Sequence, residues 1–287
     1  MLYSNEPSVI VGKHQNAFAE INHWYVKEKK IKVVRRLSGG GTVFHDSGNL
    51  NFCFIRNGKE GSLVDFHKFT QPIIEVLQGL GVPAERSGRN DLIINGLKFS
   101  GNAEHIYRNR TLHHGTLLFS SHLEILSKAL KVTPENFQDK AVKSVRSKVT
   151  NIVDFIPGNI TMEDFRDCII QHINAAFPES KNYTFQTDEV TAIKHLVANK
   201  YSGWDWNFGY SPKFSFRNHG TINGDFVEID LDVDQGVIKC IIVKVNTKII
   251  SETSEILTNV PYDDEYILAK LQQIKSVNAS SWLKLFF

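Results

Sequence analysis

The sequence predicts an α+β protein, with a large mixed α/β domain over residues 1–210 and a small α+β domain over residues 211–287. Three observations support this prediction. Segments with the alternation or β-branched content of strands lie between segments with helical apolar spacing. The aromatic run WDWNFGYSPKFSF, around Gly209 and Pro212, marks a change of composition and a natural hinge. Two alternating segments joined by the turn Asp234-Gln235-Gly236 and a final helix then follow, as in a second small unit.

Seven segments have the pattern of strands. They are Ser8–Val11, Lys32–Arg36, Asn49–Ile55, Asp91–Ile94, His113–Phe119, Phe226–Val233 and Val237–Val245. Four stretches have helical spacing, namely Leu63–Leu80, Leu123–Leu130, Thr161–Phe177 and Tyr266–Ile274. Pro72 predicts a kink or a later start in the first of these helices. Thr161, with Asp164 three residues on, predicts the amino-terminal cap of the third.

Composition places the chain among ordinary globular proteins. It has 287 residues, of which 41% are hydrophobic and 22% charged. A net charge of +2 disfavours a nucleic-acid binder that depends on backbone charge. The three cysteines have no paired spacing, which excludes a C-x-x-C redox pair and a zinc knuckle. The amino terminus lacks a signal-peptide pattern, and no apolar run approaches the roughly 20 residues of a spanning helix. We therefore expect a cytoplasmic monomer that binds neither nucleic acid nor membrane.

The strongest local signal is RRLSGGGTVFHDSGNLNF, in which three consecutive glycines, 39–41, follow a predicted strand. Glycine allows positive φ and lets a ligand approach the backbone closely. Successive N–H groups in such a turn suit phosphate or carboxylate oxygens. The segment is neither a P-loop nor a dinucleotide fingerprint. A tight turn needs one or two glycines, so three of them, bracketed by Arg35, Arg36, His45 and Asp46, favour a ligand-binding loop.

A second motif, SGRNDLIINGLKFSGNA, predicts a hairpin that turns at Asn95-Gly96. The returning strand would bring Lys98 opposite the end that begins with Asp91. A surface hairpin with a solvated lysine is the simpler alternative. In the functional interpretation, Asp91 holds Mg²⁺, and Lys98 stabilises phosphate and acyl oxygens with its compact charge.

Two further motifs contain histidines and basic residues. His113 and His114 are neighbours in a predicted strand and face opposite sides, so they cannot easily ligate one metal. We expect them in a polar pocket wall or at hydrogen-bonded core positions. The stretch Lys140–Ile152 concentrates basic residues without acidic ones. It is either a solvated face or a mobile loop that closes over a nucleotide or an acyl-phosphate intermediate.

Six motifs in order, RRLSGGGTVFHD, SGRNDL, KFSGNA, HHGTLL, SVRSKVTN and WDWNFG, resemble those of single-chain bacterial lipoate–protein ligases, the lipoate–protein ligase A family. The resemblance covers nearly the whole chain. It implies the α+β catalytic fold that these enzymes share with biotin–protein ligases and octanoyl transferases. It also implies two steps, in which lipoate attacks the α-phosphate of ATP in the presence of Mg²⁺ and a lysine of a lipoyl domain then attacks the lipoyl-adenylate. The implied acceptors are 2-oxoacid dehydrogenase E2 subunits and the glycine-cleavage H protein.

Site residues follow from the resemblance by motif position. Lys98 corresponds to the family lysine that contacts both the lipoyl carbonyl and the phosphate, so it is the implied catalytic residue. Asp91 is the implied metal residue. The residues implied to bind ATP and lipoyl-adenylate are Arg36, Ser38, Gly40, Gly41, Thr42, Val43, Phe44, His45, Asn90, Lys98 and Arg146.

Alternatives remain open at this point. An ATP-independent lipoyl or octanoyl transferase would suit the same fold, although no cysteine lies within the six motifs to act as a nucleophile. A biotin ligase is disfavoured because its G-R-G-R-x-G-R type of loop is absent. A non-catalytic lipoate-binding protein would not need Lys98 at the phosphate. Family members usually have an extra strand and a helix with an N-L-A-[LVI]-E motif ahead of SNEPSVIVGKHQN. This sequence starts at that segment, so either its start is shortened or this member does without those elements. In the second case we expect one edge of the main sheet and part of the pocket wall to be open.

Overall fold

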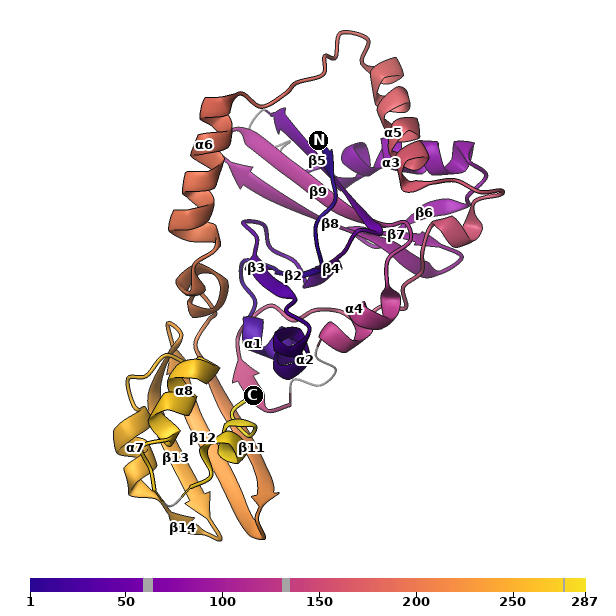
Figure 1. Cartoon of the computed structure of the whole chain (residues 1–287). Helices are drawn as coiled ribbons and strands as arrows, with labels where there is room; N and C mark the ends of the chain where they lie inside the picture. Colours follow the sequence, from indigo (N-terminus) through magenta and orange to yellow (C-terminus); the bar gives the residue numbers. More distant parts are fainter. Residues whose placement is uncertain (59–63, 131–134, 276) are drawn as a thin grey trace. The chain divides into compact units, whose positions relative to one another are not determined.

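The computed structural model describes residues 1–58, 64–130, 135–275 and 277–287 (Figure 1). The chain forms two compact units, each built from separate stretches. Unit 1 contains residues 1–13, 36–127 and 144–194, and unit 2 contains residues 14–35, 128–143 and 195–287. Residues 195–210 thus belong to the same compact unit as residues 211–287, and the division at residue 210 stays a prediction. Within the described residues, no helix is long and apolar enough to cross a membrane.

Unit 1 contains an antiparallel sheet of six strands. In sheet order they are β1 (Leu2–Tyr3), β5 (Asn49–Asn57), β9 (Arg110–Leu118), β8 (Leu97–Tyr107), β7 (Asp91–Ile94) and β6 (Ala84–Ser87). The short strand β1 is the edge of this sheet beside β5. The predicted hairpin turn at Asn95-Gly96 joins β7 to β8. These two residues have φ values of +50° and +80°. Both positive values are what a tight two-residue hairpin turn requires.

Two helices, α3 (Phe66–Gly79) and α5 (Met162–Ala176), pack against each other and the sheet (Figure 1). Their inward-facing residues, such as Leu77 and Phe165, are fully buried in one core with Phe52 and Phe99 of the sheet. Burial of such side chains contributes roughly 1.5–3 kcal/mol each. This apolar core holds the polar loops of unit 1 in place.

Both predicted long helices are present. The first was expected at Leu63–Leu80, but it begins after Asp65, whose side chain accepts from Lys68 N at 3.0 Å. Leu63 lies outside the described residues. The helix continues through Pro72, so this proline does not delay the start. The second helix, α5, has the predicted cap at Thr161, completed by a reciprocal bond with Asp164.

Other elements in unit 1 and at its ends are short. Strand β2 (Ser8–Val11) pairs antiparallel with β4 (Val43–His45), directly after the glycine-rich loop. A single 3₁₀ turn covers Val153–Phe155. Helix α4 (Leu123–Ala129) is close to its predicted bounds. The chain passes from unit 1 to unit 2 within α4 and again within α6 (Thr187–Leu196).

Unit 2 contains an antiparallel sheet of five strands. They are β10 (Phe137–Asp139), β11 (Phe214–Ile222), β12 (Asp225–Asp234), β13 (Val237–Val245) and β14 (Lys248–Ile249). Alternate residues of β12 from Val227 to Val233 are buried, so one face of the sheet forms a core. The remaining elements are α1 (Ala17–Glu20), α2 (His23–Glu28), β3 (Lys32–Arg35), π-helical turns at Val197–Tyr201 and Asp205–Gly209, α7 (Ser251–Leu257), α8 (Asp264–Leu271) and α9 (Ala279–Leu283).

Two expectations for unit 2 were wrong. The helix expected at Tyr266–Ile274 is α8, but it is not the last, because α9 follows it. That helix has only five residues, too few to show helical spacing, and it forms because Asn278 caps it and Trp282 and Leu283 are buried. The small domain was expected to have two strands, from Phe226 and from Val237, yet strand β11 precedes them and begins within the aromatic run.

Candidate functional site

The glycine-rich loop of unit 1 is built around the side chain of Arg36. Its Nη2 donates to the carbonyl oxygens of Gly39 and Gly41, both at 2.7 Å, and its Nη1 donates to Ile10 O at 3.0 Å. Gly40, with a φ of +90°, allows the loop to present two carbonyls to one guanidinium. Burial lowers the pKa of Arg36 to about 10, so the side chain stays protonated at neutral pH.

This arrangement fixes the direction of the loop's N–H groups. In a trans peptide the carbonyl and the following N–H point in opposite directions. Because the carbonyls of Gly39 and Gly41 face Arg36, the N–H groups of Gly40 and Thr42 face away from it. The N–H of Thr42 donates to Ser144 Oγ at 2.9 Å. The Gly40 N–H therefore lies on the side opposite the arginine, as an anion-binding turn requires, whereas the Thr42 N–H is bound to Ser144.

Two histidines line the same loop in neutral form. Ser38 Oγ accepts from Arg36 Nε at 3.1 Å and lies 2.6 Å from His114 Nε2, within hydrogen-bond distance. His45 Nδ1 lies 2.9 Å from Asn5 Nδ2. Burial and the charge of Arg36 lower the pKa of both His45 and His114 to about 3. These imidazoles are therefore uncharged acceptors or donors at physiological pH.

Lys98 and Asp91 form an ion pair across the β7–β8 hairpin, as the sequence predicted. Lys98 Nζ lies 2.9 Å from Asp91 Oδ1, and the two side chains are 24% and 28% exposed. An ion pair this exposed contributes on the order of 0–1 kcal/mol to folding, so it adds little stability. The lysine folds back over Gly101, where an added Cβ would lie 3.4 Å from Nζ and 4.0 Å from Val43 Cγ1. The amine thus lies beside β4, which follows the glycine-rich loop.

The segment from Ser144 to Thr150 ties the loop and the hairpin together. Ser144 Oγ binds the N–H of Thr42, and Gly41 leaves room for it, since an added Cβ would lie 3.1 Å from that oxygen. Further on, Lys98 N donates to Lys148 O and Thr150 N donates to Lys98 O, both at 2.9 Å. The basic stretch therefore runs alongside the strand of Lys98, and its Arg146 side chain is exposed.

The remaining predicted residues have mainly structural surroundings. Phe44 is 2% exposed in β4. Asn90 precedes Asp91 and is exposed, and its Nδ2 donates to Asn102 O at 3.2 Å. Lys143, counted in the basic stretch, belongs to unit 2, where its Nζ lies 2.6 Å from the buried Asp139.

The carboxylate of Asp91 fits a magnesium ion that is held mostly by substrate. Mg²⁺ commonly keeps several waters and is bound through one or two carboxylates together with substrate phosphates. Within the described residues, no group of three or more histidine, cysteine or acidic side chains forms a metal cage. The opposite orientation of the adjacent histidines is confirmed, because His114 contacts Ser38 whereas His113 contacts Glu104 and Asn102. A shared metal between them is therefore excluded.

Arg35, next to Arg36, has a separate role inside unit 2. It is fully buried and donates to the carbonyls of Gln15 at 2.7 Å and Asn207 at 2.9 Å. The indole of Trp206 donates back to Arg35 O at 2.8 Å. The WDWNFG motif is thus explained by packing around a buried arginine, and nothing in this contact set requires a ligand.

Comparison with known proteins shows the family of the chain. Residues 1–174 match the family model of the lipoyl protein ligase A/B catalytic domain. The chain belongs to the lipoate–protein ligase family. It is 42% identical over 241 residues to lipoate-protein ligase LplJ of Bacillus subtilis, an alignment that covers 83% of the chain and 73% of that protein.

Solved structures of this family have the same fold. A bi-partite lipoate protein ligase from Thermoplasma acidophilum, studied with its E2 lipoyl domain, matches with a TM-score of 0.63 and 27% identity, covering 73% of the chain and 83% of its own. A lipoate-protein ligase A bound with ATP matches with a TM-score of 0.61 and 26% identity, covering 73% and 85%. The predicted α+β ligase fold and the predicted enzyme class are confirmed.

Sequence reasoning did not single out three residues whose side chains take part in these contacts. Ser144 was treated only as part of a basic stretch, and Asn102 and Glu104 were not considered. Asn102 and Glu104 are two positions apart in β8, a spacing that places both side chains on one face of the sheet. That spacing, next to the polar His113 on the neighbouring strand, is a signal that could have found them.

Proposed function

We propose that this enzyme activates lipoate with ATP and transfers the lipoyl group to a lysine of a lipoyl domain. The observation that supports this most strongly is the Lys98–Asp91 pair, held beside a glycine-rich loop whose Gly40 N–H faces away from Arg36. A cation, a carboxylate and backbone donors in one place suit a nucleotide triphosphate and a carboxylate substrate. The ATP-bound relative supports the choice of nucleotide, and the relative studied with its lipoyl domain supports the choice of acceptor.

In the first step, a carboxylate oxygen of lipoate attacks the α-phosphorus of ATP. The bond from that phosphorus to the bridging oxygen breaks, and pyrophosphate leaves with the electron pair. Lys98 neutralises charge on the carboxylate and the α-phosphate as they approach, and the N–H groups of the loop orient the phosphate oxygens. Mg²⁺, held at Asp91 and by the phosphates, would supply further charge neutralisation when bound.

In the second step, the amine of the acceptor lysine attacks the acyl carbon of lipoyl-adenylate. The carbon–oxygen bond to AMP breaks, the nitrogen loses a proton to solvent, and an amide is formed. Positioning and charge neutralisation are sufficient, so no covalent protein nucleophile is needed. The exposed Arg146 segment, which lies alongside Lys98, is placed to contact the adenylate phosphate.

A transferase that works through a cysteine thioester is disfavoured by the same structure. Burial raises the pKa of Cys53, so its thiol is less readily ionised than a free cysteine. Thiolate is the reactive form of such a nucleophile. Cys240 is exposed and belongs to unit 2.

Lipoate-dependent exchange of radioactive pyrophosphate into ATP tests the first step directly. We expect Lys98→Ala to lose this exchange by about 100-fold or more, in line with removal of one transition-state charge contact. Lys68→Ala, which removes an exposed lysine of α3 in the same unit, is the matched control and should keep wild-type exchange. Absence of lipoate-dependent exchange in the wild-type chain would contradict the proposal.

A further inference from the structure

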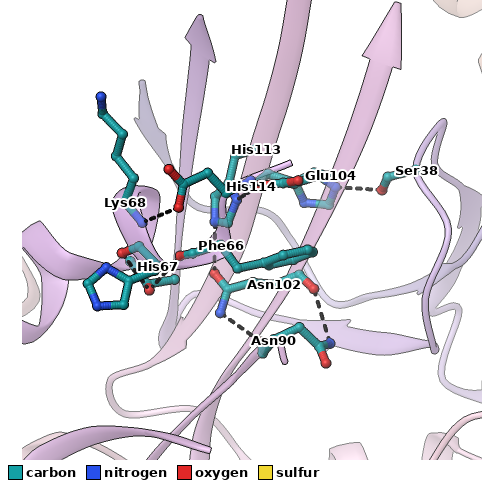
Figure 2. Close-up of polar contacts among 11 residues, drawn as sticks. Ser38, Phe66, His67, Lys68, Asn90, Asn102, Glu104, His113 and His114 are labelled. Carbon is teal, nitrogen blue, oxygen red and sulfur yellow. Dashed lines mark hydrogen bonds and ion pairs between the residues drawn. The ribbon is translucent and has the colours of Figure 1, made fainter. Parts of the chain in front are cut away.

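A row of polar residues, exposed at Asn90 and buried beyond it, crosses the sheet of unit 1 (Figure 2). It runs from Asn90, through Asn102 of β8 and His113 of β9, to Glu104 of β8. His113 is 0% exposed and Asn102 is 5% exposed. The adenylation chemistry proposed above assigns no role to Asn102, His113 or Glu104.

Three hydrogen bonds clamp Asn90 to Asn102. Asn90 O accepts from Asn102 N at 2.9 Å and from Asn102 Nδ2 at 3.0 Å. Asn90 Nδ2 donates in return to Asn102 O at 3.2 Å. Asp91, the next residue, pairs with Gly101 in the sheet and binds Lys98. The clamp therefore sets the backbone from which the Asp91 carboxylate projects.

His113 fixes the orientation of the Asn102 carboxamide. Because Asn102 Nδ2 donates to Asn90 O, the other carboxamide atom, Oδ1, must accept from His113 Nε2, which lies 3.3 Å away. The proton of neutral His113 is then on Nε2, and Nδ1 is left as an acceptor. Nδ1 lies 3.0 Å from Glu104 Oε1, a distance that requires one proton between the two atoms. Burial lowers the pKa of His113 to about 4, which keeps the imidazole neutral, and it raises the pKa of Glu104 above its ordinary value.

The surroundings of this row are apolar, so each of its polar groups has to be hydrogen-bonded to avoid destabilising the fold. The His113 ring stacks on Phe69, with centroids 4.8 Å apart, and on Phe52, 5.9 Å apart. An unpaired polar group in such a place costs about 1–3 kcal/mol. Gly115 leaves the space that the carboxamide fills, since an added Cβ would lie 2.2 Å from Asn102 Oδ1. The sheet is thus shaped to hold Asn102 rather than another apolar side chain.

We propose that His113 is a positioning residue for adenylation, because it holds Asn102 in the orientation that fixes Asn90 and places Asp91 beside Lys98. Glu104 acts through His113, because its contact with Nδ1 keeps the His113 proton on Nε2. The expected effect on adenylation rests on the proposed function. The orientation of Asn102 by His113 is a property of the free protein and does not depend on that function.

Variants of the full chain separate the role of the His113 N–H donor from the role of the shape of the His113 side chain. His113→Gln keeps an N–H that can reach Asn102, whereas His113→Phe keeps the aromatic packing but removes the donor. Phe69→Leu perturbs the same apolar surroundings and breaks no hydrogen bond, so it serves as the control. Asn102→Asp, which keeps the shape but loses both side-chain donors, is used if His113→Phe does not fold.

The first readout is amide hydrogen exchange of Asn102 in the free protein, since this N–H binds Asn90 O. We expect exchange about tenfold faster in His113→Phe or Asn102→Asp, the equivalent of one lost hydrogen bond, and wild-type exchange in His113→Gln and Phe69→Leu. The second readout is pyrophosphate exchange. We expect kcat/KM for ATP to fall about tenfold in the donor-lacking variants, with KM for lipoate changed less than about twofold.

Two results would overturn the inference. One is wild-type Asn102 exchange and wild-type ATP kinetics in a folded donor-lacking variant. The other is a His113→Gln variant as impaired as His113→Phe, which would show that the donor is not what matters. If the wild-type chain shows no lipoate-dependent pyrophosphate exchange, the proposed function fails, and the hydrogen-exchange comparison still decides whether His113 holds the Asn90–Asn102 clamp.

Discussion

Acidification should weaken unit 1 through its buried histidines. His45 is 6% exposed and His113 is 0% exposed, and burial lowers their pKa values from 6.5 to about 3 and about 4. His114, with a pKa of about 3, acts in the same direction. Each imidazole is held neutral in the folded state, whereas the unfolded chain binds a proton near pH 6.5.

The sign and size of the effect follow from this difference. A depressed folded-state pKa gives a contribution to stability that is fully present above pH 6.5 and is lost as pH falls toward 3–4. For His113 the whole loss is on the order of 3 kcal/mol, at about 1.4 kcal/mol per pH unit. His45 and His114 add similar slopes, and the raised pKa of Glu104 opposes the slope from His113, so the unfolding free energy should fall by about 3 kcal/mol per pH unit below pH 6. That is a large part of the roughly 5–15 kcal/mol typical of a domain.

The assay has to report on unit 1 itself. Trp24, Trp204, Trp206 and Trp282 all lie in unit 2, so tryptophan fluorescence reports on the other unit. Urea denaturation at several pH values, followed by a deuterium pulse at one fixed pH, measures protection in peptides from β5 and β9. The variant His113→Gln, which cannot titrate, should reduce the slope by about 1.4 kcal/mol per pH unit. Equal stability of these peptides at pH 7 and pH 5 would refute the reasoning.

Two further predictions concern the loop and a helix cap. Gly40→Ala should cost about 1–2 kcal/mol because φ is +90° and the new Cβ would lie 3.1 Å from Arg36 Nη2, and it should lower pyrophosphate exchange. Gly79→Ala, at an open position in α3, is its control and should raise stability by about 0.5–1 kcal/mol, as followed by urea denaturation. Thr161→Ala should cost about 1 kcal/mol by loss of the α5 cap and leave exchange unchanged, and a fall in exchange would mean that α5 contributes to the site.

Much of the site could be predicted because its signals are local. The Asn95-Gly96 turn sets the register that places Lys98 opposite Ile93, next to Asp91, and this follows from a dipeptide. The cap at Thr161 is equally local. What the sequence could not give were contacts between distant residues, such as Ser144 with Thr42, which form only when the tertiary fold exists.

The roles of the two arginines show the same limit. Both stood beside the glycines and suggested ligand contacts, yet Arg35 binds backbone carbonyls inside unit 2 and Arg36 shapes the loop from within. A side chain's direction depends on burial, which a single sequence does not report. The row from Asn102 to Glu104 was missed for a related reason, because alternation marks the face of a strand but not the polar partner across it.

The most direct test of the central claim is lipoylation of an apo lipoyl domain by the purified chain, with lipoate and Mg²⁺, in the presence and absence of ATP. A mass increase of the acceptor by one lipoyl group, seen with ATP and abolished by Lys98→Ala, is the predicted result. Lipoylation that proceeds equally without ATP, or that survives in Lys98→Ala, would contradict the account.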